Sequence, residues 1–228
     1  MRRHLWAALL VGAASAVSVG VSATPAAAVV HTWTVTPGGN FVTSVPGAGS
    51  VLTDGNTLAR FNCDGLTAQG VLASGTGLLN PIAHITVVNS AVSGTPQIDC
   101  SGHGLSFALT FTHFPMDIAG TRYDATLGKV TGEIRGIAAT ISALTGAPAC
   151  AATVDGTAAG ARNGAARFAY LNSSGLLGTF SGVSSSPLHA YNATGCNSRI
   201  RTGDVLTYKA SFTMVSSPGA TVNTITSP

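Results

Sequence analysis

Hydrophobic and polar residues alternate with a period of two along much of this chain. The clearest run, residues 105–111 (LSFALTF), places leucine or phenylalanine at every second position and Ser, Ala or Thr between them. Residues 206–214 (LTYKASFTM) repeat the pattern. Such alternation predicts β-strands with one buried and one solvated face. We expect further strands at residues 32–36, 66–72, 84–88, 130–134, 137–141 and 167–171.

Turn-forming residues separate these runs. Clusters of Gly, Pro, Asn, Asp and Ser lie at residues 37–40, 54–56, 93–96, 172–175 and 202–204. The 28 Gly and ten Pro spread along the chain disfavour long helices. Many short strands with regular turns predict an all-β fold, either an antiparallel sandwich or a barrel.

A faint repeat also runs through the chain. Residues 63–70 (CDGLTAQG) resemble residues 150–157 (CAATVDGT), and each leads to a second Cys followed by a strongly alternating strand. The repeat predicts two similar halves, 29–114 and 115–228, with a boundary near Phe114-Pro115. The alternative is that any two β-hairpins of such a protein resemble each other.

The N-terminus is typical of a secretory signal. Arg2 and Arg3 form a charged start, an apolar run continues to Val21, and small residues at Ala26 and Ala28 suit a signal peptidase. We expect a signal peptide over residues 1–28 and a mature β-domain over residues 29–228. A single-pass anchor is the alternative, and both the general secretory and the twin-arginine routes stay open.

Charge is sparse. The chain has 11 Lys and Arg against 8 Asp and Glu; without Arg2 and Arg3 the mature part has 9 against 8, a net charge of +1. Charged residues make up 8% of the chain, against roughly 25% in ordinary soluble domains. Nucleic acid is therefore excluded as an expected partner, because phosphate binding needs clustered Lys and Arg.

Several segments together resemble a group of uncharacterised secreted proteins from actinobacteria. They are residues 31–39 (HTWTVTPGG), residues 150–157, the Gly195-Cys196 step before Gly203-Asp204, and the ending 225–228 (ITSP). The resemblance implies export and a β-rich fold, and it transfers no site residue.

Four Cys residues in an exported chain indicate structural disulfides. Zinc is the alternative, but the sequence has no C-x-x-C or close Cys/His pair. Four Cys allow three connectivities. Each half carries one Cys before a Gly-rich hairpin and one just before its best strand, which predicts pairing in sequence order: Cys63 with Cys100 and Cys150 with Cys196.

No catalytic, metal or cofactor motif stands out. The nearest two mature histidines are ten residues apart, Ser106 lies inside a predicted strand rather than at a sharp turn, and Glu133 is the only Glu. Most Asp residues precede or follow Gly, where turns favour them. We therefore predict no catalytic residue, metal or cofactor. The residues whose side chains could in principle supply such chemistry are His31, His84, His103, His113, His189, Ser106, Glu133, Asp54, Asp64, Asp155 and Asp204.

Two local features are candidate sites. Residues 113–117 (HFPMD) place an imidazole and a carboxylate around a Pro, where a strand-to-strand crossover is the simpler interpretation. A sugar-binding row would need exposed aromatic residues, and two of the five candidates lie within alternating strands and suit a core. The candidates are Trp33, Tyr123, Tyr170, Tyr191 and Tyr208.

The leading hypothesis is an exported, non-enzymatic β-protein that binds a small ligand or associates with the cell envelope. It would be secreted or extracellular, with at most a loose envelope attachment. Two alternatives remain: a secreted hydrolase whose site is assembled from distant residues, and an envelope pore-forming β-barrel, which would have apolar residues facing lipid.

Overall fold

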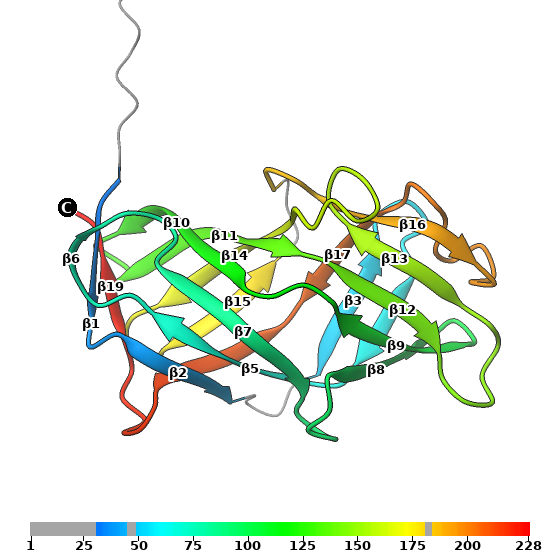
Figure 1. Ribbon diagram of the computed structural model, residues 1–228, viewed down its shortest axis with the longest axis horizontal. Coiled ribbons are helices and arrows are strands. Elements are labelled where there is room, and N and C mark those ends of the chain that lie inside the picture. Colours follow the sequence, from blue (N-terminus) through cyan, green and yellow to red (C-terminus); the bar gives the residue numbers. More distant parts are fainter. Residues whose placement is uncertain (1–30, 45–48, 181–183) are drawn as a thin grey trace, which may run out of the picture.

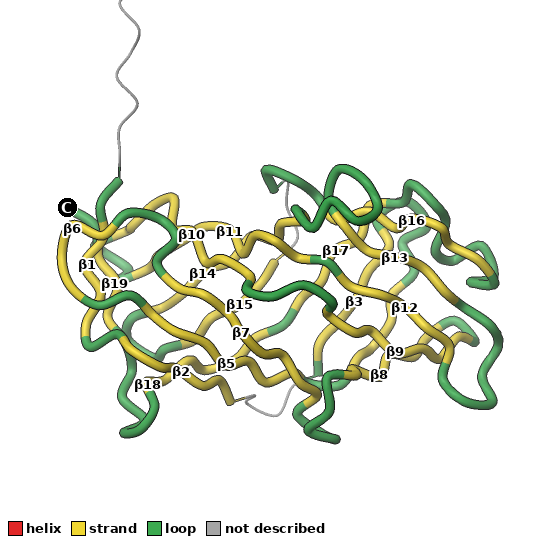
Figure 2. Tube along the Cα trace, viewed as in Figure 1, coloured by secondary structure: helices red, strands yellow, loops and turns green. Residues whose placement is uncertain are grey.

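The chain folds into two closed eight-stranded antiparallel barrels placed end to end, with a three-stranded sheet at one end (Figure 1). The computed structural model describes residues 31–44, 49–180 and 184–228. These ranges contain strands, turns and loops but no helix, so the all-β prediction is confirmed in its barrel form (Figure 2). The predicted signal peptide and the predicted mature start at Val29 lie outside the described residues.

One barrel, which we call the capped barrel, carries the three-stranded sheet at its outer end (Figure 1). The sheet consists of β19 (Thr224–Thr226), β1 (Trp33–Thr36) and β6 (Gly75–Leu78). The barrel consists of β2 (Gly39–Ser44), β5 (Leu66–Leu72), β7 (Ala83–Ser90), β10 (Met116–Asp124), β11 (Lys129–Ile137), β14 (Gly164–Leu171), β15 (Leu176–Phe180) and β18 (Ser211–Ser216).

The other barrel, which we call the disulfide barrel, holds all four Cys residues in or beside its strands. It consists of β3 (Ser50–Asp54), β4 (Arg60–Cys63), β8 (Gln97–Gly102), β9 (Leu105–Phe111), β12 (Ala139–Ala143), β13 (Ala151–Asp155), β16 (Leu188–Thr194) and β17 (Val205–Lys209).

The two barrels are built from one meander. The chain alternates between a turn at an outer end and a crossing at the junction, so that β2 continues into β3, β4 into β5, and so on to β17 and β18. When each strand is matched with the one it crosses to, the order around both barrels is the same: 10-11-14-15-18-2-5-7 in one and 9-12-13-16-17-3-4-8 in the other. All neighbours are antiparallel. The molecule is therefore one long up-and-down barrel interrupted at its middle.

The interruption divides two of the strands that the sequence predicts. The eight predicted runs all form strand, but the runs at 137–141 and 206–214 are each broken by one residue, Ala138 and Ala210. The inward face does not change at the second break, because Ala210 stays buried between Tyr208 and Phe212. Period-two alternation reports only which face is buried. The alternation therefore does not show that residues 206–214 begin in one barrel and end in the other.

Large aromatic side chains fill the barrels, and inward glycines make room for them. At Gly120 an added Cβ would lie 2.4 Å from Cζ2 of Trp33, whose side chain is completely buried. Phe41, Phe168 and Tyr170 are buried in the same barrel. Such pairing of small and large inward residues is typical of small closed barrels.

The disulfides join Cys63 to Cys100 and Cys150 to Cys196, the connectivity in sequence order. Cys63 and Cys100 face each other on β4 and β8, which are hydrogen-bonded neighbours. Two formed disulfides are compatible with an oxidising compartment.

The halves 29–114 and 115–228 are not the two barrels, because each barrel takes strands from both sides of Phe114-Pro115. That dipeptide lies in the crossing from β9 to β10. The internal duplication stays a prediction.

Candidate functional site

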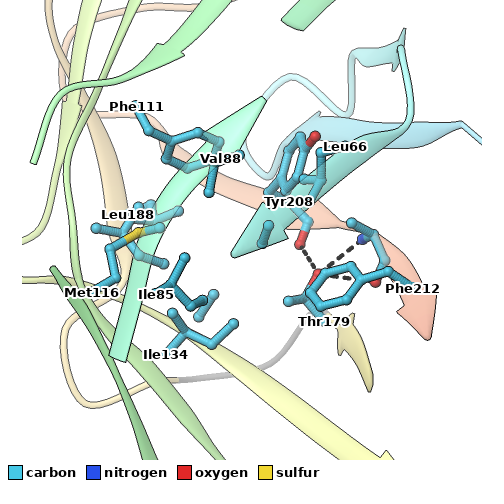
Figure 3. Close-up of a pocket in the computed structure, with 14 residues that line it drawn as sticks. Leu66, Ile85, Val88, Phe111, Met116, Ile134, Thr179, Leu188, Tyr208 and Phe212 are labelled. Atoms are coloured by element: carbon cyan, nitrogen blue, oxygen red, sulfur yellow. Dashed lines mark hydrogen bonds between the residues drawn. The ribbon is translucent and has the colours of Figure 1, made fainter. Parts of the chain in front are cut away.

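The inward side chains at the junction leave an apolar cavity of about 50 Å³. Its walls come mainly from the capped barrel, while Phe111, Leu188 and Tyr208 of the disulfide barrel close one side. In Figure 3 the labelled side chains converge on this space. The complete lining is Leu66, Ala68, Ile85, Val88, Phe111, Met116, Ile134, Ile137, Ala166, Thr179, Leu188, Tyr208, Ala210 and Phe212.

The two hydroxyl groups in this lining are both engaged in hydrogen bonds. The Tyr208 hydroxyl pairs with Oγ of Ser50, and Ser50 Oγ also contacts the carbonyl oxygen of Asp64 at 2.8 Å. Burial raises the pKa of Tyr208 well above its ordinary value, so this hydroxyl stays neutral. An apolar cavity without free polar partners holds water poorly and suits an apolar guest.

Thr179 lines the cavity beside Ala210, the residue that separates β17 from β18. Its Oγ1 accepts a hydrogen bond from the Ala210 N–H at 2.8 Å and donates one to the Tyr208 carbonyl at 2.8 Å (Figure 3). The Thr179 N–H donates to the Ala210 carbonyl at 2.8 Å. The side chain and the backbone N–H of Thr179 together satisfy the N–H and the carbonyl of Ala210 between β17 and β18.

A smaller groove of about 30 Å³ lies beside the cavity. It runs between the beginning of β14 and the strand β17, and Ser184 and Pro187 form part of its rim. Three residues, Ala166, Leu188 and Tyr208, line both the groove and the cavity. At the groove, the described surface is therefore separated from the cavity by these three side chains.

Glu133 anchors the rim of this groove. On β11 it accepts hydrogen bonds from the N–H and the Oγ of Ser185, the latter at 2.6 Å, and from Arg135 Nε at 3.2 Å. Burial alone would raise the pKa of Glu133, but these hydrogen bonds outweigh it and hold the pKa below its ordinary value. Glu133 is therefore a charged structural anchor for residues 184–187.

The structure separates the His113–Asp117 cluster. Nδ1 of His113 lies 3.0 Å from the Gly136 carbonyl, whereas Oδ1 of Asp117 lies 2.7 Å from Nδ1 of His84 on the neighbouring strand β7. His84 and Asp117 are both about half exposed on the outer face. Residues 112–115 form a crossing between the barrels, in line with the simpler interpretation.

The remaining histidines are apart from one another. His103 Nε2 accepts a hydrogen bond from the Arg60 N–H at 3.2 Å, His189 lies edge-on to Tyr191, and His31 is exposed. Within the described ranges, no group of three His, Cys, Asp or Glu side chains is placed to hold a metal ion.

The Asp residues beside Gly act in turns. Asp54 Oδ1 accepts hydrogen bonds from the N–H groups of Asn56 and Thr57, and Asp204 Oδ2 accepts one from Arg201. Burial raises the pKa of Asp54, and the nearby Asp204 carboxyl raises it further.

The five aromatic candidates are all at least partly buried. Trp33, Tyr170 and Tyr208 are buried, and Tyr123 and Tyr191 are partly buried. They do not form an exposed sugar-binding row. Ser106 lies within β9, as predicted.

Sequence reasoning missed the cavity, the Glu133–Ser185 anchor and the role of Thr179. Glu133 and Ser185 are 52 residues apart, and Thr179 and Ala210 are 31 apart. The only available signal was that Glu133 sits inside an alternating strand as the single Glu of the chain.

Comparisons with known proteins give no match among protein-family models, curated proteins or solved structures. In the part of the chain that the structure describes, we find no helix with the length and apolar character needed to span a membrane.

Proposed function

We propose that this protein is an exported, non-enzymatic carrier or receptor for a small apolar ligand, which it holds in the cavity between its barrels. The cavity carries the proposal, since its surface is apolar and its two hydroxyls are already paired. Export rests on the predicted signal peptide and on the resemblance to secreted actinobacterial proteins, and the two disulfides are compatible with it.

The size of the cavity limits the guest. About 50 Å³ is roughly a third of the 150 Å³ apolar cavity that binds benzene or xenon. For very small ligands the affinity reaches at most about 1.5 kcal/mol per non-hydrogen atom. A guest with four carbon atoms would therefore reach a dissociation constant of about 40 µM at best.

The alternatives receive less support from the arrangement of side chains. A lipid-embedded pore needs apolar residues outside and polar ones inside. In β9 and β17 the inward residues are Leu, Phe and Tyr, while Ser106, Thr207 and Lys209 lie on the other face. A hydrolase needs a nucleophile beside a base. Among the described residues, His84 and His113 are hydrogen-bonded to a carboxylate and to a carbonyl, not to a hydroxyl.

The test uses the processed, disulfide-bonded protein and dissolved xenon. Methyl NMR should show shifts at Ile85 and Ile134, which line the cavity, and none at Ile98, buried in the disulfide barrel. The change Ala68→Val should fill the cavity and abolish these shifts. The change Ala169→Val on the outer face of β14 is the matched control. Uniform shifts, or shifts that survive Ala68→Val, would contradict the proposal.

A further inference from the structure

We propose that the natural guest is a short-chain amphiphile with an anionic head, bound with its head at Arg167 and its apolar chain in the cavity between the barrels. This inference rests on the proposed function and names the class of ligand for the same site. Three observations support it: the residues that groove and cavity share, the cation at the groove that forms no ion pair among the described residues, and the apolar lining of the cavity beyond.

The strand ladders near β15 are short in the described residues. This strand pairs with β18 only from Leu176 to Gly178, and β16 pairs with β17 only at Leu188 and His189. Between these ladders the described wall is held by Thr179 and by the hydrogen bond that the Ala165 N–H donates to the Ser186 carbonyl at 2.7 Å. The groove lies at this gap, and a chain passing between Ala166 and Leu188 would enter the cavity.

Arg167 is the cation at this gap. Its guanidinium carbon lies 5.5 Å from the centre of the Phe180 ring, and both residues line the groove. Among the described residues Arg167 forms no ion pair. Glu133, the cross-strand partner of Arg167 on β11, already accepts hydrogen bonds from Ser185 and Arg135. Stacking on a ring uses the face of a guanidinium and leaves its N–H edge free to donate.

An anionic head matches this position chemically. A guanidinium binds a carboxylate or a phosphate through two parallel hydrogen bonds. Because Arg167 is exposed, the head can keep part of its hydration, so no charge has to be buried. The apolar chain gains from leaving water, and the lining offers it only apolar atoms.

The experiment compares ligands of equal chain length. Titration calorimetry with the processed protein measures pentanoate, butyl phosphate and butan-1-ol, each with a four-carbon apolar chain, and methyl NMR at Ile85 and Ile134 reports whether each chain enters the cavity. We expect at least one anion to bind roughly tenfold more tightly than the alcohol. Whichever of the two binds more tightly identifies the head as carboxylate or phosphate.

Variants separate the head from the chain. Arg167→Gln should weaken binding of the anion roughly tenfold and leave binding of butan-1-ol unchanged. Arg122→Gln, an exposed Arg on β10 that does not line the groove, should change neither. Equal binding of alcohol and anions, or anion binding unaffected by Arg167→Gln, would overturn the anionic head and leave the apolar site standing. If none of the three ligands shifts the cavity methyl groups, this inference fails, and the xenon experiment decides separately whether the proposed function stands.

Discussion

Met116→Ala should turn the cavity between the barrels into a benzene-binding site. Met116 is 3% exposed and lines the cavity. The change removes three heavy atoms, each of which contributes about 0.8 kcal/mol of transfer free energy. If each atom occupies nearly the volume of a water molecule, about 30 Å³, the cavity grows by roughly 80 Å³. At 24 cal/mol per Å³, that growth costs a further 2 kcal/mol or so.

The expected loss of unfolding free energy is thus about 4 kcal/mol, within the range known for core Met truncations. For a domain of this size it corresponds to a fall in Tm of roughly 8 to 16 °C. The enlarged cavity, about 130 Å³, approaches the volume that holds benzene. Benzene at ten times its dissociation constant should restore about 1.4 kcal/mol.

Thermal and urea unfolding with and without benzene measure both effects. Met214→Ala is the matched control, because Met214 is equally buried in the capped barrel but does not line the cavity. It should lose a similar free energy and gain nothing from benzene. Equal rescue of the two variants, or none of Met116→Ala, would refute the reasoning about the cavity.

Two further changes test the packing and the buried charge. Gly120→Ala should destabilise the protein by roughly 1 to 3 kcal/mol in urea unfolding, because its Cβ would lie 2.4 Å from the Trp33 ring. Gly178→Ala, whose nearest contact would be 3.4 Å, should be nearly neutral, and equal losses would contradict this. The pKa of Asp54 is raised above its ordinary value of 3.8, so its protonated form stabilises the fold below that pH, and this stabilisation is lost as the pH rises through the folded-state pKa. Asp54→Asn keeps the acceptor oxygen and can donate a hydrogen bond to Asp204. The free energy of unfolding should therefore rise by roughly 1.5 kcal/mol at pH 7 and by much less at pH 4. A gain independent of pH would show that the charge of Asp54 is not the cause.

The strands were predictable because alternation is a local property. Residues 105–111 and 206–214 bury every second side chain in the structure, as their sequence indicates. The disulfides followed from a local argument as well, since Cys63 and Cys100 belong to strands that pair directly. In both cases the information lies within a few residues or within one unit of neighbouring strands.

The number of barrels was not predictable by the same means. A one-residue break at Ala210 leaves the inward face unchanged, so the pattern of residues 206–214 is the same for one barrel as for two. The break is stabilised by Thr179, which is 31 residues away in sequence. Only the closed arrangement of strands brings that hydroxyl to the unpaired backbone.

Sequence alone therefore determined the all-β class, the strand segments and the sparse charge, and it favoured the Cys pairing that the structure shows. The tertiary structure alone decided the junction, the cavity and the groove with Arg167. The physical reason is that a cavity is what packing leaves unfilled, and this one depends on side chains such as Phe111, Met116 and Tyr208 from separate strands. No local sequence pattern shows where the cavity lies, because each of these residues has the pattern of an ordinary core residue within its own segment.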